Sequence, residues 1–115
     1  MYICREEYQN DIRRVLPNIK NLEQLKGKSV LITGVSGMIG SFLADLLMYL
    51  NINSDYGVDI WALGRDEHAL RKRFASYEDN KNWHMLIQDV TKPMSCDMHV
   101  DYIIHAAGDG YPEAF

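Results

Sequence analysis

Three glycines stand at a spacing that suits the binding of a diphosphate group. Gly34, Gly37 and Gly40 come between an apolar segment, 29–33, and a segment, 38–50, whose apolar residues recur at helical spacing. A turn from a strand into a helix directs backbone N–H groups and the positive end of the helix dipole at one place, which favours an anion. Gly34 would then allow the tight turn, Gly37 the close approach of a diphosphate, and Gly40 the packing of helix on strand.

The alternative for this turn is a glycine-rich helix start that binds nothing. It is disfavoured because each glycine within a helix costs about 1 kcal/mol without a local benefit. No Lys-Ser or Lys-Thr pair follows, so the turn is not a triphosphate loop. We infer a dinucleotide site.

The residues after the second apolar segment bear on which dinucleotide binds. An NAD site favours an acidic residue about 20 residues past the glycines, at the end of the second strand. Asp59 is nearest by count, but it falls near the start of that strand. Arg65 and Asp66 follow its end; Arg65 suits a 2′-phosphate, although it could be a solvated loop cation, and Asp66 could reach a ribose if the turn is tight. The sequence therefore favours NADP over NAD.

Two later segments fit the same cofactor. Asp89 follows the third expected strand, where it could bond the adenine amino group or act only as a turn or capping residue. Ala106, Ala107 and Gly108 follow the fourth, and small residues there would let the middle of the cofactor lie against the backbone.

The elements that position these residues alternate along the chain. Strands are expected at 29–33, 58–63, 83–88 and 100–105, and helices at 38–50 and 67–77, the second capped by Asp66. Residues 51–57 have the composition of a loop. This order predicts an α/β fold, a Rossmann-type, mostly parallel sheet with helices on both faces, truncated. We expect a partial NAD(P)-binding domain at 28–115 and an N-terminal helical extension at 1–27, whose helix (5–16) Pro17 ends.

Composition excludes several other classes of protein. The chain has 115 residues, 47% of them hydrophobic, and a net charge of −4 without a Lys/Arg block, which argues against nucleic-acid or anionic-membrane binding. The longest nearly apolar run, Phe42–Leu50, contains Asp45 and is too short to span a bilayer. The N-terminus has no apolar signal region, and Cys4 and Cys96 form no disulfide framework. We expect a cytoplasmic protein.

Three motifs together resemble those of the extended short-chain dehydrogenase/reductases, and more narrowly the nucleotide-sugar epimerase/dehydratase/decarboxylase branch. They are Leu31-Ile32-Thr33-Gly34-x-x-Gly37-x-Ile39-Gly40, Asp89-Val90, and Asp101-Tyr102-Ile103-Ile104-His105-Ala106-Ala107. The resemblance covers residues 28–115. It implies a nucleotide-sugar substrate for the full-length enzyme, whose sugar carbon is oxidised transiently before the hydride is returned.

The resemblance also assigns cofactor contacts, residue by residue. The pyrophosphate would be held by Gly34, Gly37 and Gly40, with Met38 and Ile39 against the cofactor, Arg65 at the adenosine ribose, Asp89 and Val90 beside adenine, and Ala106, Ala107 and Gly108 toward the nicotinamide.

The family's catalytic Tyr-x-x-x-Lys pair has no counterpart at the expected place, after a fifth strand. One literal match, from Tyr77 to Lys81, lies between the second helix and the third strand, and we interpret it as a solvated helix end. We therefore name no catalytic residue. The four histidines share no metal-ligand spacing, and His105 is expected to be a satisfied histidine of the core.

These observations predict a chain that binds NAD(P) without turnover. One alternative is a non-catalytic NADP(H)-binding regulatory or redox-sensing module, and another is a chain that folds but binds nothing. An incomplete parallel sheet leaves a strand edge or one face bare, so we also expect self-association.

Overall fold

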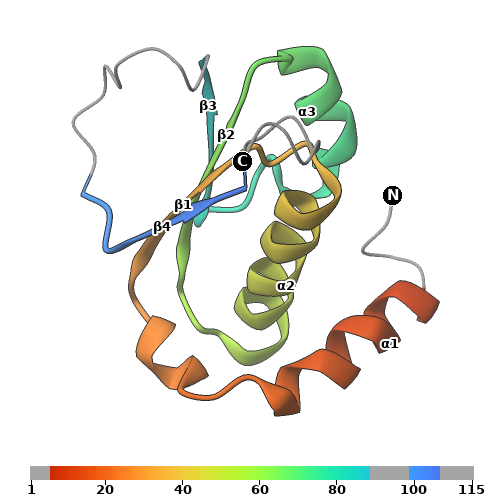
Figure 1. Cartoon of the computed structure of the whole chain (residues 1–115), viewed down its shortest axis with the longest axis vertical. Helices are drawn as coiled ribbons and strands as arrows, with labels where there is room; N and C mark the ends of the chain where they lie inside the picture. The colour runs from red at the N-terminus through yellow and green to blue at the C-terminus, as the bar shows by residue number, and fades with distance from the viewer. Residues whose placement is uncertain (1–5, 89–98, 107–115) are drawn as a thin grey trace, which may run out of the picture.

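A four-stranded parallel sheet forms the centre of the molecule (Figure 1). The computed structural model describes residues 6–88 and 99–106. The strands are β1 (Ser29–Thr33), β2 (Asp59–Gly64), β3 (Trp83–Ile87) and β4 (Tyr102–His105), in the order β3-β2-β1-β4. Every paired neighbour runs parallel, which confirms the predicted Rossmann-type α/β fold.

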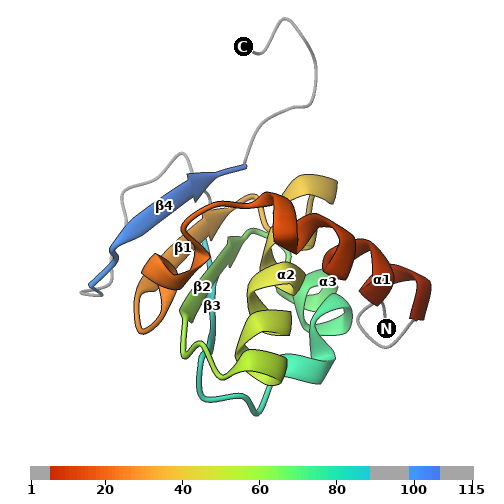
Figure 2. The same ribbon diagram turned by 90° about the horizontal axis from the view of Figure 1, so that it is seen from below.

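Helices connect these strands and precede them. They are α1 (Glu6–Val15), α2 (Met38–Ser54) and α3 (Glu67–Arg73), with short 3-10 turns at Leu16–Asn18, Leu22–Leu25 and Ala75–Tyr77. The predicted cap of α3 is confirmed, because Asp66 Oδ1 accepts a hydrogen bond from the Ala69 N–H at 3.1 Å. In the described ranges, α1, α2 and α3 all lie on one side of the sheet (Figure 2). Of the predicted helices on both faces, the described residues therefore supply those of one face.

Helix α2 is longer than predicted. Residues 51–54, which have the composition of a loop, continue the helix to Ser54, and the chain turns at Asp55, whose φ of 51° is left-handed. The side-chain amide of Asn51 explains the difference: it donates to the Val58 carbonyl at 2.9 Å and accepts from the Val58 N–H at 2.8 Å. Asn51, whose residue type is typical of loops, therefore connects the end of α2 to the start of β2.

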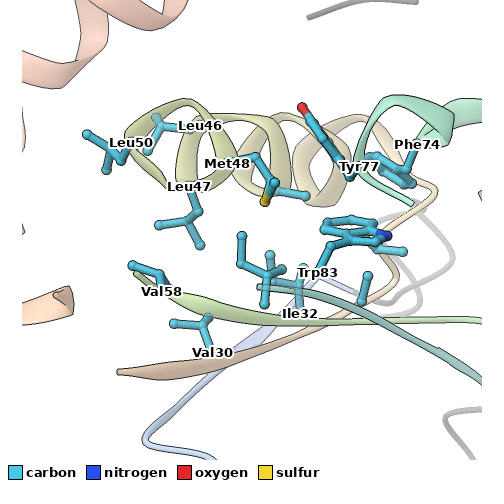
Figure 3. Close-up of a cluster of buried hydrophobic side chains, with 14 of the residues drawn as sticks. Val30, Ile32, Leu46, Leu47, Met48, Leu50, Val58, Phe74, Tyr77 and Trp83 are labelled. Atoms are coloured by element: carbon cyan, nitrogen blue, oxygen red, sulfur yellow. The ribbon is translucent and has the colours of Figure 1, made fainter. Parts of the chain in front are cut away.

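The hydrophobic core lies between the sheet and α2 and α3 (Figure 3). Alternate residues of the central strands point toward the helices and are fully buried, as the two-residue period of a strand requires. The ring of Trp83 on β3 packs against Phe74 and Tyr77, with centroids 4.9 and 5.0 Å away. Helix α1 joins this body through Ile12, which is also fully buried.

One carboxylate is buried on the helix side of the sheet and holds three segments together. Asp45 of α2 accepts hydrogen bonds from the hydroxyls of Tyr8 on α1 at 2.7 Å and Tyr77 at 2.6 Å, and it is paired with the guanidinium of Arg73 on α3. Its side chain is inaccessible to solvent, so these partners replace the water that a carboxylate requires. The prediction that Tyr77 lies on a solvated helix end is wrong, because its ring is in the core and its hydroxyl meets Asp45.

Candidate functional site

The turn between β1 and α2 requires glycine at two of its three glycine positions. Gly34 has a φ of 66°, a left-handed conformation that other residues adopt at a cost. A Cβ on Gly40 would lie 2.4 Å from the Gly34 carbonyl oxygen, closer than any packing allows. Gly34 and Gly40 are therefore explained by the local fold: one makes the turn, and the other lets α2 start directly above it.

Gly37 is different, because nothing in the fold demands glycine there. Its φ of −74° and ψ of 171° are open to any residue. A Cβ would meet one neighbour, the Gly34 carbonyl oxygen, at the ordinary contact distance of 3.4 Å. The position is exposed. The missing side chain therefore leaves open space in front of the turn, and that space suits the approach of a diphosphate.

Backbone donors face the same end of α2. The first bond of the helix runs from the Ser41 N–H to the Gly37 carbonyl at 2.9 Å, so the N–H groups of Met38, Ile39 and Gly40 have no partner within the helix. The first turn carries no acidic side chain. Met38 and Ile39 are large apolar residues, yet they are 88% and 70% exposed. Helix α2 thus begins with free donors and an uncovered apolar surface.

The turn also lies where the order of the strands reverses. The chain leaves β1 through α2 toward β2, whereas β4 pairs with the opposite edge of β1. Ligands of open α/β sheets bind outside the carboxyl ends of the strands at such a point. Ala106 comes next to it, because it follows β4 and its N–H donates to the Thr33 carbonyl at 3.1 Å.

The three charged candidates for cofactor binding lie at opposite ends of β2. Arg65 follows the carboxyl end of β2 and is exposed, while Asp66 next to it caps α3. Asp59 is the first residue of β2, at the opposite end of the strand, and accepts from the side-chain amide of Asn82 at 3.1 Å. The expectation that Asp59 falls at the strand's start is confirmed. Asp89, Val90, Ala107 and Gly108 lie outside the described residues.

The prediction that His105 lies in the core is wrong. It ends β4, a strand at one end of the described sheet, and is exposed. Its Nδ1 lies 2.8 Å from Oγ1 of Thr33, its partner in the β1–β4 register. Sequence reasoning missed this pair because 72 residues separate its members. The sequence did hold one signal for this pair, because each of the two residues is the last one of an apolar strand.

The literal Tyr-x-x-x-Lys match has the wrong properties for a proton acceptor. Burial, with the Asp45 carboxylate beside it, raises the pKa of the Tyr77 phenol. A catalytic tyrosine in this role needs the opposite shift. Tyr77 is thus a buried partner of Asp45 in this fold, and that it takes no part in catalysis stays a prediction.

Residues 6–88 and 99–106 also have features away from the glycine turn that bear on ligand binding. A surface hollow of about 180 Å³ is lined by Arg71, Phe74, Glu78, Trp83 and Met85, and none of these residues belongs to the glycine turn. No three acidic, histidine or cysteine side chains come together as metal ligands within these ranges. None of the helices there has the length and apolar character that a bilayer crossing demands.

Fold and turn together define a nucleotide-binding unit of the Rossmann type. Residues 30–114 match the model of the NAD dependent epimerase/dehydratase family, and the chain belongs to this family. It is 30% identical over 111 residues to UDP-glucuronic acid decarboxylase 1 of Xenopus tropicalis; the match includes 94% of this chain and 24% of that protein. The chain thus spans about a quarter of the length of this relative.

Solved structures agree on the fold. Two structures of a short-chain dehydrogenase from Shigella flexneri superpose with a TM-score of 0.50 at 23% identity, over 75% of this chain. The superposition includes 42% of the first of those chains and 37% of the second. Membership of the family implies a nicotinamide dinucleotide as cofactor.

Proposed function

We propose that this chain binds a nicotinamide dinucleotide at the carboxyl edge of the sheet, with its diphosphate against the turn from Gly34 to Gly40. The open space at Gly37 carries this proposal, since the fold itself does not require glycine there. The free N–H groups at the start of α2 supply the donors that a diphosphate accepts.

The remaining contacts follow from the order of the strands. Met38 and Ile39 would pack against the cofactor, which accounts for their exposure. Arg65 would meet the adenosine ribose, Asp89 and Val90 would flank adenine, and Ala106, Ala107 and Gly108 would lead to the nicotinamide. Bound there, the nicotinamide ring supplies a hydride acceptor for a sugar carbon.

NADP is the preferred cofactor in this proposal. Arg65 is an exposed cation directly after β2, while the neighbouring carboxylate, Asp66, already caps α3. A guanidinium pairs well with a 2′-phosphate. The chain would therefore bind NADPH more tightly than NADH, and Arg65→Ala would remove most of the difference.

We propose that this chain is the cofactor-binding part of a larger cytoplasmic enzyme, and that the whole enzyme acts on a nucleotide sugar. The family and the relative named a decarboxylase of UDP-glucuronic acid support this class of substrate. We propose further that these 115 residues bind the cofactor without turnover, because the one literal Tyr-x-x-x-Lys match has its tyrosine, Tyr77, buried in the core with its hydroxyl on Asp45. A regulatory NADP(H)-binding module is the alternative.

Self-association forms the last part of the proposal. Tyr102 and Ile103 of β4 are 42% and 67% exposed, and β4 is the end strand among those described. Exposed apolar strands at the end of a sheet tend to pair with other chains.

The test is a fluorescence titration of the purified chain with NADPH and NADH, beside the variant Gly37→Ala. We expect saturable binding that Gly37→Ala weakens at least about tenfold, because the added methyl group occupies the approach of the diphosphate. Thermal melting should change little, since the new Cβ meets only ordinary contacts.

One control variant makes the result specific. Lys20→Ala removes an exposed cation far along the chain from the turn and should leave both affinities unchanged, unlike Arg65→Ala. Absence of binding by the folded wild-type chain would overturn the proposal, as would a Gly37→Ala variant with wild-type affinity.

A further inference from the structure

Strand β3 lies at the end of the described sheet that is opposite β4 (Figure 1). Two hydrogen bonds show which of its backbone groups face β2. At one end of the strand, the Ile60 N–H donates to the Asn82 carbonyl at 2.8 Å. At the other end, the Gln88 N–H donates to the Gly64 carbonyl at 2.8 Å. Because backbone groups alternate in direction along a strand, those of the even-numbered residues from 82 to 88 face β2.

The outer edge of β3 therefore belongs to Trp83, Met85 and Ile87, whose backbone groups point away from β2. The Trp83 N–H donates to the Asn80 carbonyl at 3.1 Å. The Trp83 carbonyl and both backbone groups of Met85 and Ile87 meet no other strand in the part of the chain that the structure describes. An edge with such donors and acceptors is a template for pairing with another strand.

The usual protections of a sheet edge are missing from β3. Proteins commonly block exposed edges with charged side chains, proline or a bulge. The strand Trp83–Ile87 contains no Lys, Arg, Asp, Glu or Pro, and its residues pair one to one with those of β2. The sequence of β3 therefore does not oppose the addition of a further strand.

The surface hollow described above lies beside this edge, on the face of the sheet that carries the helices. Its walls are the side chains of Trp83 and Met85 from β3 and of Arg71, Phe74 and Glu78. The guanidinium of Arg71 pairs with the Glu78 carboxylate at 3.2 Å, so these two charges match each other. A hollow of about 180 Å³ with aromatic walls and matched charges suits an apolar side chain rather than an ion.

Ile87 is an apolar side chain that a second copy can bring to this hollow. It is 40% exposed, and it points to the same face of the sheet as Trp83, four residues before it. It does not line the hollow of its own chain. If Met85 of one copy faces Met85 of an antiparallel partner, Ile87 of one copy stands opposite Trp83 of the other. The exposed side chain and the hollow are therefore complementary across a twofold axis.

We propose that β3 pairs antiparallel with β3 of a second copy of this chain, with the twofold axis at Met85. Such an interface uses the same patch on both copies. Each Met85 backbone donates to and accepts from the other, and each Ile87 N–H donates to the Trp83 carbonyl of the other copy. Side chains directly opposite each other in an antiparallel pair share a face, so each Ile87 enters the hollow of the other copy.

This interface is separate from the self-association proposed for β4, which lies at the other end of the described sheet, and it does not rest on cofactor binding. The test therefore starts from the Ile103→Thr variant, in which the contact through β4 is weakened. We expect this variant to sediment as a dimer in sedimentation velocity over a range of concentrations. Adding Ile87→Lys places a charge against Trp83 and should raise the dissociation constant of the dimer at least about tenfold. Adding Val15→Lys instead, on an apolar residue of α1 that is 37% exposed, should leave it unchanged.

A disulfide test checks the register without destabilising the strand. In a chain that carries Cys4→Ser and Cys96→Ser, Met85→Cys should form a covalent dimer on oxidation. Facing residues in this kind of pair have Cα atoms about 5.5 Å apart, which is within the range of a disulfide. Ile87→Cys is the matched control, because the two copies of residue 87 would be about 14 Å apart along the strands. Non-reducing electrophoresis should show the covalent dimer for Met85→Cys and only a trace of it for Ile87→Cys.

Three results would overturn the proposal. They are an Ile103→Thr chain that sediments as a monomer, a dimer whose dissociation constant Ile87→Lys leaves unchanged, and cross-linking through Ile87→Cys as efficient as through Met85→Cys. The titration of the wild-type chain with NADPH and NADH is measured separately. Failure of this interface therefore leaves the proposed cofactor site standing, and a chain that binds no cofactor leaves the interface standing.

Discussion

β1 and β4 are paired neighbours with similar side chains and different surroundings. Val30, Leu31 and Ile32 of β1 are at most 5% exposed, whereas Tyr102 and Ile103 beside them are 42% and 67% exposed. Both segments read as apolar strands in the sequence. The difference shows that an apolar run predicts a strand but not how many of its faces are covered.

Two aspartates repeat this contrast. Asp45 is buried among α1, α2 and α3, with Tyr8, Tyr77 and Arg73 as partners. Asp101, directly before β4, accepts from the Ser29 N–H at 2.8 Å and from His99 at the exposed edge. Each carboxylate joins segments distant in sequence, but Asp45 is shielded from water. The helix side should therefore determine the stability of the fold, and β4 should contribute little to it.

The largest effect is expected from Asp45→Ala. It leaves Arg73 and two tyrosine hydroxyls without their acceptor on the helix side, which should lower the free energy of unfolding by about 3–5 kcal/mol. Urea denaturation measures this, with Asp101→Ala as the matched control, expected within about 0.5 kcal/mol of wild type. Equal losses in the two variants would abolish the contrast.

Gly40→Ala tests how the helix side is joined to the turn. The new Cβ would lie 2.4 Å from the Gly34 carbonyl oxygen, so α2 or the turn must shift. We expect a loss of about 1–3 kcal/mol in the free energy of unfolding, typical of overpacking. Gly37→Ala should lose much less, and denaturation curves that coincide for the two would contradict this description of the turn.

Tyr8→Phe isolates the contribution of α1. It removes one hydroxyl from Asp45 but keeps the ring that packs edge-on against Phe42, with centroids 6.0 Å apart. Hydrogen bonds to charged groups contribute about 1.5–3 kcal/mol, and the partly exposed position favours the lower end. Tyr102→Phe on β4 is the control, and a neutral Tyr8→Phe would mean that α1 docks through its apolar face alone.

Ile103→Thr should leave stability nearly unchanged, within about 0.5 kcal/mol, because the side chain is already exposed and threonine suits a strand. It should instead reduce self-association, which sedimentation velocity measures over a range of concentrations. A monomeric wild-type chain would refute the proposed self-association.

The smallest effect concerns the protonation of Asp101. The Ser29 N–H, and then His99, lower the pKa of this carboxyl below its ordinary value of 3.8. A lowered pKa means that the contribution of Asp101 to stability is present above that ordinary value and is lost as pH falls through the lowered one. The NMR shift of the Ser29 amide proton should titrate with a midpoint below 3.8, and the inflection should vanish in Asp101→Asn.

Local patterns predicted most of the fold. The run 29–33, the glycine turn, the start of α2 at Met38 and the cap at Asp66 each depend on residues close in sequence, and the structure has all of them. Prediction failed where a side chain meets a partner outside its own helix or strand. Asn51 meets Val58, 7 residues on and past the end of the helix, and Tyr77 meets Asp45, 32 residues away.

The candidate site divides in the same way. Gly34, Gly37 and Gly40 could be placed from spacing alone, because strand, turn and helix are consecutive. The contact between Thr33 and His105 could not, since it depends on β4 pairing with β1 rather than with β3, its neighbour in sequence. That Gly37 is free of constraint while Gly40 is not could also be learned only from the atoms around them.

The carboxylate of Asp45 has a consequence for the order in which the chain assembles. Its partners come from three segments spread over residues 8–77, so docking any two of them without the third leaves a buried group short of a hydrogen bond. The N-terminal helix is thereby made part of one cooperative folding unit rather than an appendage. A protease should find α1 no more accessible than α2 until the whole molecule opens.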